Sequence, residues 1–269
     1  MIGNLLFSSA PLILASLGAL FSEYAGVLAV FADGIITLSA FFTYTFALFT
    51  GNIFAAVILS AVLCSLLVLS FGWFIEKTGM NPFLSATAMN LFFNSLTSVF
   101  SFFIFHTRGV LVSQEFSYNP LAAKLISVGG TFVLVVLSML FLFKTKHGMY
   151  LRVTGSDSDV LEVKGISASR IRIYAWGLSA FFAALAGSIL AVRINSFVPN
   201  ISAGRGWIAL AAVFAGKKKL PWITAAVILF CAADYFGITL QTVLPGACAN
   251  AVPYFAAVIL IALSPEQRQ

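Results

Sequence analysis

The 269-residue sequence has very little charge: only 9% of its residues are Asp, Glu, Lys or Arg, against roughly 25% in ordinary soluble domains. This shortage excludes water-facing globular domains, and no stretch is long and polar enough for a separate catalytic or nucleic-acid-binding domain. Histidine is also scarce, because His106 and His147 are the only two, and they lie far apart. A zinc site or a nucleophilic triad is therefore not expected, and neither is any metal or cofactor.

The sequence also lacks a phosphate-binding loop of the form Gly-x-x-x-x-Gly-Lys-Ser/Thr. Gly216-Lys217 is followed by another lysine and has no glycine-rich turn before it, so the chain is not expected to bind ATP itself. The three cysteines, Cys64, Cys231 and Cys248, stand singly in apolar surroundings and are expected to be small buried residues. We expect a protein that is not an enzyme and whose energy, if it needs any, comes from another subunit.

Apolar residues, by contrast, make up 61% of the sequence, and the mean hydropathy is +1.03. The bilayer is the solvent that suits this composition, since a spanning helix needs about 20 mostly apolar residues. The sequence predicts one all-α polytopic transmembrane domain over residues 1–269, with a retained N-terminal helix and about nine spans. The expected spans are 4–21, 26–49, 52–75, 83–106, 122–143, 171–193, 204–216, 221–243 and 250–264.

Basic residues lie in short segments between the apolar runs, so the net charge of +6 is interpreted as membrane topology. Segment 144–172 contains six of them, and residues 217–219 are three lysines. Nine crossings from an external N-terminus put both segments on one side, which the positive-inside rule makes cytoplasmic. The basic residues left outside are Arg108, Lys124, Arg193 and Arg205.

The seventh predicted span, 204–216, is short for a complete crossing. It follows an irregular stretch, and glycines stand at 204, 206 and 216. Broken helices that line a transporter cavity have this pattern, as does a short tilted helix in a locally thin bilayer. The charge pattern favours a crossing, because a re-entrant segment would separate the triple lysine from segment 144–172.

The sixth predicted span has small residues at every fourth position. This spacing predicts close packing against a neighbouring helix rather than against lipid. The two adjacent rows are Ala180, Ala184 and Ser188, and Ala183, Gly187 and Ala191.

A few polar side chains lie inside the predicted spans and are candidates for the substrate path. Asp33 and Asp234 are expected to face protein or a water-filled cavity, because an unpaired charge is costly in hydrocarbon. Either carboxylate also suits a structural role, accepting hydrogen bonds from a broken helix. Asn90 and Asn94, one turn apart, form a polar face that suits a ligand or a neighbouring helix.

The sequence has 28 phenylalanines, and most are expected to face lipid or the core. Phe31, Phe92 and Phe93 are the better candidates for a cavity, since they flank Asp33 and Asn90. A flat heterocycle would stack on such rings.

The most informative polar stretch is the loop over residues 147–172. Ser156, Asp157 and Ser158 are good helix N-caps, residues 159–164 can form a short amphipathic helix, and Gly165 supplies its end. A short capped helix between basic ends has the form of a docking element, although a solvated connector has the same composition.

This loop resembles the pattern G-x-x-L-R-A-x-G-x-N-x-x-A-A-x-x-x-G-I-S of permease subunits in ABC importers of the branched-chain amino-acid, ribose and nucleoside permease superfamily. The matching residues are Gly148, Leu151, Arg152, Gly155, Gly165, Ile166 and Ser167. An upstream motif is similar to the family's P-L-x-L-A-x-x-G-x-x-F-S-E-x-x-G-V-x-N-I-x-x-E-G through Pro11, Gly18, Phe21, Ser22, Glu23, Gly26, Val27 and Gly34. A downstream motif resembles G-x-G-F-I-A-L-A-A-x-x-x-G-x-x-x-P through Gly204, Gly206, Ile208, Ala209, Gly216 and Pro221. With LFCAAD and Val252-Pro253-Tyr254, the motifs cover about residues 10–255 in the family's order.

The resemblance implies a multi-pass protein of the bacterial cytoplasmic membrane with a coupling helix near 157–164. That helix would sit in a groove of a cytoplasmic ATPase, two subunits or one fused chain, and an extracytoplasmic binding protein or lipoprotein would deliver substrate. The residues that the resemblance places at this ATPase contact are Arg152, Gly155, Ser156, Asp157, Asp159, Leu161, Glu162 and Gly165.

The chain departs from the family pattern at three places. The family's asparagine before the broken second helix is Ala29 here, and its glutamate is Asp33. Its loop motif Asn-x-x-Ala-Ala is replaced by Asp-Ser-Asp-Val-Leu at residues 157–161. These departures favour a heterodimer, in which a second, more typical permease subunit contributes the missing groups.

The motif versions are most similar to the nucleoside branch, which includes importers of nucleoside-like vitamins such as riboflavin. The chain is therefore expected to form half of a translocation path for such a substrate, with a sugar or a branched-chain amino acid as the alternative. A function of a different class is a stand-alone ion-coupled transporter with Asp33 and Asp234 as its ion sites.

Overall fold

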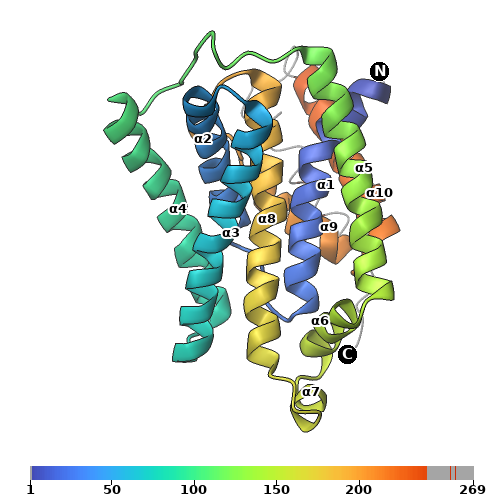
Figure 1. Ribbon diagram of the computed structural model, residues 1–269. Helices are drawn as coiled ribbons and strands as arrows, with labels where there is room; N and C mark the ends of the chain where they lie inside the picture. The colour runs from blue at the N-terminus through green and yellow to red at the C-terminus, as the bar shows by residue number, and fades with distance from the viewer. Residues whose placement is uncertain (1, 241–254, 256–257, 259–269) are drawn as a thin grey trace.

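The computed structural model describes residues 2–240 together with residues 255 and 258. Residues 2–240 form ten helices, and one isolated antiparallel bridge joins Leu111 to Phe197 (Figure 1). The helices are α1 (Ile2–Tyr24), α2 (Ala32–Thr50), α3 (Ile53–Thr78), α4 (Pro82–Phe105), α5 (Pro120–Lys144), α6 (Lys146–Ser156), α7 (Asp159–Val163), α8 (Ala168–Ile194), α9 (Arg205–Ala215) and α10 (Leu220–Leu240).

Asparagine side chains start the three helices α3, α4 and α5. Asn52, Asn81 and Asn119 each accept a hydrogen bond from a backbone N–H in the first turn, which satisfies a donor that the helix itself leaves free. Pro82 and Pro120 occupy the first helical position, where a missing N–H costs nothing. The long apolar helices therefore begin where the sequence provides both a cap and a proline.

Six helices of the described residues are long and apolar enough to cross a membrane: α2, α3, α4, α5, α8 and α10. The predicted count of nine is not confirmed by the described residues. The expected span 4–21 lies within α1, in which Ser9, Ser16 and Ser22 are fully buried. The expected span 204–216 is only the 11 residues of α9, and 250–264 lies outside the described residues apart from 255 and 258.

Helix α8 occupies the centre of the bundle and packs against α1, α2 and α3 (Figure 1). Its small residues permit this, as the sequence predicted. A Cβ on Gly187 would overlap the carbonyl oxygen of Ile36, so α8 and α2 touch backbone to backbone. Beside this contact the hydroxyls of Thr43, Ser60 and Ser188 form a closed hydrogen-bonded triangle with edges of 2.8, 2.8 and 3.1 Å.

The predicted second span, 26–49, is wrong at its start, because the helix begins only at Ala32. Gly26 adopts a left-handed φ of 77° and Val27 N–H bonds back to Ser22, so the chain turns sharply after α1. Residues 25–31 then run without a regular helix to α2. Residues 25–31 are themselves mostly apolar and adjoin the apolar run of α2, so the hydropathy pattern does not reveal the break.

Helix α9 forms only part of a crossing. Its 11 residues span about 16 Å, roughly half of the hydrocarbon core of a bilayer. The irregular residues 195–204 precede it, and Asn195, Asn200 and Ala203 have positive φ. The expected short or broken helix near 204–216 is therefore present, as a half-length helix after a non-helical segment.

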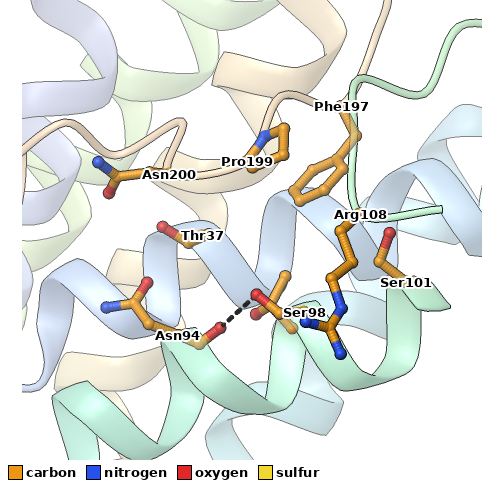
Figure 2. Close-up of a pocket in the computed structure, with 9 residues that line it drawn as sticks. Thr37, Asn94, Ser98, Ser101, Arg108, Phe197, Pro199 and Asn200 are labelled. Atoms are coloured by element: carbon orange, nitrogen blue, oxygen red, sulfur yellow. Dashed lines mark hydrogen bonds between the residues drawn. The ribbon is translucent and has the colours of Figure 1, made fainter.

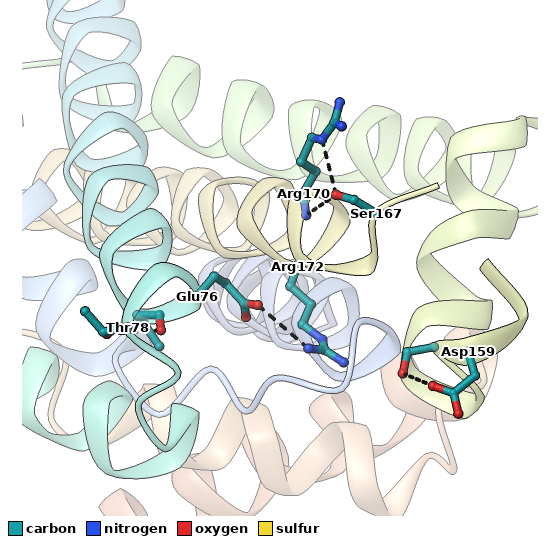
Figure 3. Close-up of polar contacts among 8 residues, drawn as sticks. Glu76, Thr78, Asp159, Ser167, Arg170 and Arg172 are labelled. Atoms are coloured by element: carbon teal, nitrogen blue, oxygen red, sulfur yellow. Dashed lines mark hydrogen bonds and ion pairs between the residues drawn. The ribbon is translucent and has the colours of Figure 1, made fainter. Parts of the chain in front are cut away.

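The two basic segments lie at the same end of the molecule, as their charge predicted; we call it the basic end. The hydroxyl of Tyr24 donates to the carbonyl of Lys218 at 2.6 Å, and the Lys218 ammonium lies 3.0 Å from Glu23. Gly155 of α6 packs against the backbone of Tyr24 and Gly26. Figure 3 shows a further ion pair at this end, in which Arg172 of α8 meets Glu76 of α3 at 3.7 Å.

Candidate functional site

A polar cavity of about 210 Å³ lies between α2, α4 and two loops (Figure 2). One of these loops, the one after α4, lies at the end of the molecule opposite α6 and α7 (Figure 1). We call it the α2–α4 cavity. Its lining residues are Thr37, Asn94, Thr97, Ser98, Ser101, Arg108, Phe197, Pro199 and Asn200. Most of them carry a hydroxyl or amide group, which is unusual for a space inside a chain this apolar.

Helix α4 supplies one continuous polar face to this cavity. Asn94, Thr97, Ser98 and Ser101 follow one another at helical spacing, so they share one side of α4. Asn94 and its neighbour Asn90 were predicted from the sequence, whereas the three hydroxyl residues were not. The signal was present, because the polar positions continue at intervals of three and four residues from Asn94.

The hydroxyl protons on this face are already used. Thr97 donates to the carbonyl of Phe93 at 2.8 Å, Ser98 to the carbonyl of Asn94 at 3.4 Å, and Ser101 to the carbonyl of Thr107 at 2.8 Å. Each hydroxyl oxygen keeps lone pairs that can accept a hydrogen bond. The α4 face therefore presents mainly acceptors.

The opposite wall of the cavity consists of the loop after α4 and the segment before α9. The Leu111–Phe197 bridge joins them through two backbone hydrogen bonds of 2.9 and 3.0 Å. The Phe197 ring is buried and meets Phe41 edge to face, with centroids 5.3 Å apart. Arg108 lies with its guanidinium 5.5 Å from the Phe102 ring, and it provides the one charged group among the described lining residues.

Asp33 does not line this cavity. Its carboxylate accepts a hydrogen bond of 3.2 Å from the backbone N–H of Gly206, in the first turn of α9. A Cβ on Gly206 would overlap the backbone of Asp33, so α2 and α9 meet with their N-terminal ends in direct contact. The positive end of the α9 dipole stabilises a carboxylate at this position.

Asn90 has a similar structural partner. Its side-chain oxygen accepts a hydrogen bond of 2.6 Å from the N–H of Gly34, and its carbonyl accepts one of 3.1 Å from Asn94. Thr37 connects α2 to the segment before α9, because its hydroxyl bonds to the Asp33 carbonyl and to Ser202. The junction of α2, α4 and α9 thus supports the floor of the cavity.

The remaining membrane candidates lie elsewhere. Phe31 is buried and stacks on Trp176 at 5.2 Å, while Phe93 is buried in the core beside Phe92, which faces outward. None of the three rings lines the α2–α4 cavity. Asp234, on α10, does not line it either, and its carboxylate lies within electrostatic range of Arg193 and Cys231.

A second, larger cavity of about 630 Å³ lies nearer the basic end, between α3, α5, α6 and α8. Its lining is mostly apolar, with Leu69, Phe141, Leu178 and Phe181 among its residues. It lacks the clustered hydroxyl and amide groups of the α2–α4 cavity, so it offers little to a polar solute.

The loop at the basic end contains two helices where the sequence predicted one. Helix α6, which includes Arg152, Gly155 and Ser156, was missed, while α7 lies within the predicted segment 157–164. The Asp157 carboxylate accepts from the N–H of Asp159, and Gly165 ends α7 with a φ of 74°.

The candidate contact residues of α6 and α7 face in different directions. Asp159 and Glu162 are exposed, whereas Leu161 is buried and fixes α7 to the rest of the chain. The guanidinium of Arg152 lies 5.0 Å from the Phe143 ring of α5. Asp159 and Glu162 therefore form an exposed acidic side of α7 among the exposed basic residues of this end, which include Lys146 and Lys164.

The sequence matches a protein-family model described as "Branched-chain amino acid transport system / permease component" over residues 1–263. It is 30% identical to the nucleoside ABC transporter permease protein NupC of Lactococcus lactis over 80% of this chain and 75% of that protein. It is 27% identical to the guanosine ABC transporter permease protein NupQ of Bacillus subtilis over 78% and 72% of the two chains. It is 26% identical to the ribose import permease protein RbsC of Haemophilus influenzae over 55% and 47%.

A solved structure of PsaBC from Streptococcus pneumoniae in complex with Fab has a similar fold. The TM-score is 0.56 with 15% identity, over 98% of this chain and 91% of that chain. The likeness therefore extends over nearly the whole chain at the level of fold.

Proposed function

We propose a transport function for this chain, which belongs to the family of branched-chain amino acid transport permease components. We infer that it is the membrane subunit of an ABC importer and forms half of a path for a nucleoside. Two of the relatives named above are permeases for nucleosides or guanosine, and both align with more than three quarters of the chain. These names favour a nucleoside over riboflavin, a branched-chain amino acid or a free sugar.

The observation that carries the proposal is the lining of the α2–α4 cavity. It combines neutral hydroxyls and amides with a single cation, and the described lining includes no carboxylate. A neutral polar solute suits such a surface, since each of its polar groups must find a partner when it leaves water. Nucleosides are neutral and rich in hydrogen-bonding groups.

The partners follow from the family and from the basic end. We propose that α6 and α7 dock on a cytoplasmic ATPase. Asp159 and Glu162 of α7 are exposed and available for such a contact, while buried Leu161 holds α7 against the rest of the chain. A second permease subunit, homologous to this chain, would complete the path. An extracytoplasmic binding protein would deliver the substrate.

The stand-alone ion-coupled alternative is less well supported. Asp33 accepts a hydrogen bond from a backbone N–H at a helix end, and Asp234 lies within electrostatic range of Arg193. Each carboxylate thus has an electrostatic partner within the protein, and the described part of the chain contains no group of three or more His, Cys, Asp or Glu side chains that could hold a metal ion.

Uptake by cells that lack the chain's gene tests the proposal. Radiolabelled guanosine, uridine, ribose, leucine and riboflavin are supplied separately, with and without the restored gene. Nucleoside uptake that returns only with the gene supports the assignment. Restored leucine or riboflavin uptake without nucleoside uptake would contradict it.

A further inference from the structure

We propose that the α2–α4 cavity binds the sugar of the nucleoside and does not recognise its base. The inference rests on the proposed nucleoside transport and adds which part of the molecule the permease recognises. It predicts that the permease distinguishes substrates by their sugar hydroxyls and accepts purine and pyrimidine bases alike.

The direction of the hydrogen bonds supports this assignment. The hydroxyls of Thr97, Ser98 and Ser101 donate to backbone carbonyls, so their oxygens face the cavity as acceptors. A ligand that matches them must bring several O–H donors at close spacing. The hydroxyls at the 2′, 3′ and 5′ positions of a ribonucleoside are such donors.

The donors of the cavity complete the match. Arg108 contributes a guanidinium, and Asn200 and Asn94 contribute amides; one Asn94 N–H is occupied by the Asn90 carbonyl. A sugar hydroxyl accepts as well as donates, so one hydroxyl can bond to both kinds of wall.

The base finds less in this space. Recognition of a flat heterocycle uses an exposed aromatic face. Phe197 is the one aromatic ring among the described lining residues, and it is buried against Phe41 at 75° between the ring planes. A free stacking face is therefore not offered by the described lining.

Thr97→Val is the sharpest variant, because it removes one acceptor from the cavity with little change in shape. Thr87→Val is its matched control. Thr87 lies on the same helix and donates to the carbonyl four residues earlier, as Thr97 does, but it does not line the cavity. Ser98→Ala provides a second test at an exposed position, where folding is not at risk.

The complete transporter, with its binding protein and ATPases, is assayed for uptake of labelled guanosine. Unlabelled uridine, 2′-deoxyguanosine and 2′,3′-dideoxyguanosine compete. In the wild type, the inhibition constant of uridine should lie within about threefold of the KM of guanosine. That of the dideoxy compound should be at least about tenfold higher than this KM. Thr97→Val and Ser98→Ala should raise the KM of guanosine. They should also lower the discrimination ratio, which is the inhibition constant of the dideoxy compound divided by this KM, about threefold or more. Thr87→Val should leave both quantities unchanged.

Because the binding protein is the same in every arm, a change in the ratio belongs to the permease. A ratio that is identical in wild type, Thr97→Val and Ser98→Ala, with uptake intact, would overturn the sugar site and leave the nucleoside function standing. Absence of any nucleoside uptake in the wild type would overturn the function itself, and the sugar site with it.

Discussion

Single residues at the centre of the bundle bring three helices together. The carboxylate of Asp33 holds the first turn of α9, and the amide of Asn90 holds the first turn of α2. Sequence reasoning identified both residues, because polar groups stand out in an apolar span. Their partners were not predictable, since Gly206 lies 173 positions from Asp33 and Gly34 lies 56 from Asn90.

Asp33→Asn tests whether this carboxylate is a cap or an ion site. An asparagine keeps an oxygen that accepts the Gly206 N–H, so transport by the complete importer should stay within about threefold of wild type. Asp33→Leu removes the acceptor and should lower both the melting temperature and the transport rate. Loss of all transport in Asp33→Asn, with normal folding, would instead indicate an ion-coupling carboxylate.

Gly206→Ala tests the close approach of α2 and α9. The new methyl group would overlap the backbone of Asp33, and overpacking of this kind costs about 1–3 kcal/mol. The purified protein should therefore melt at a lower temperature. Gly129→Ala on α5 is the control, because a Cβ there meets no atom within 4 Å, and its melting temperature should be unchanged or higher.

Among the elements, α6 and α7 connect the basic end to the centre of the bundle. Gly155 of α6 presses on the backbone turn after α1, and the same stretch of chain leads through residues 25–31 to Asp33. A displacement of α6 by an ATPase would act directly on this stretch, since rigid elements in contact move together.

Replacing residues 157–163 by a Gly/Ser linker tests the role of α7. We expect co-purification of the ATPase subunits and ATP-driven uptake to fall at least about tenfold. The melting temperature should fall as well, because the linker removes buried Leu161, so a second linker variant that keeps Leu161 tests the exposed side of α7 alone. Val163→Ser, at a position that is 90% exposed, is the control and should retain both. Normal ATPase association in the linker variant would place the dock elsewhere.

Apolar runs predicted the long helices well, and their boundaries differ from prediction by a few residues. The exceptions have a common physical cause. Helix α6 is not apolar enough to stand out in a hydropathy pattern, and the break before α2 depends on hydrogen bonds of Ser22 and Val27 that no run reveals. Likewise, the hydroxyl face of α4 was overlooked because Thr and Ser are common helix-packing residues in membranes.

At the scale of the whole molecule, the structure separates a polar cavity at one end from a charged loop region at the other. The spatial arrangement of the helices, with α8 at the centre, could not be predicted from any sequence motif. The small residues of α8 predicted only that this helix packs closely against a neighbour. The charge distribution did predict that segments 144–172 and 217–219 lie together. This is confirmed, because Lys218 bonds to Tyr24 and Gly155 packs against the backbone of the same Tyr24.

Cysteine labelling tests how this arrangement sits in the membrane. Cysteines introduced at Lys219 and Val163 should react with a membrane-impermeant thiol reagent only from the cytoplasmic side, and one introduced at Gly109 only from outside. The labelling is done in a Cys248→Ser background, because Cys248 lies outside the described residues, whereas Cys64 is buried and Cys231 is half-buried. Labelling of positions 219 and 163 from opposite sides would contradict a common basic end.

The most direct test of the account is flux in liposomes. The chain is reconstituted alone, and also with ATPase subunits, a binding protein and the proposed second permease subunit. We predict ATP-dependent nucleoside accumulation only in the complete assembly and none by the chain alone, with or without an ion gradient. Nucleoside flux through the chain by itself, driven by an ion gradient, would contradict the assignment as an ABC permease subunit.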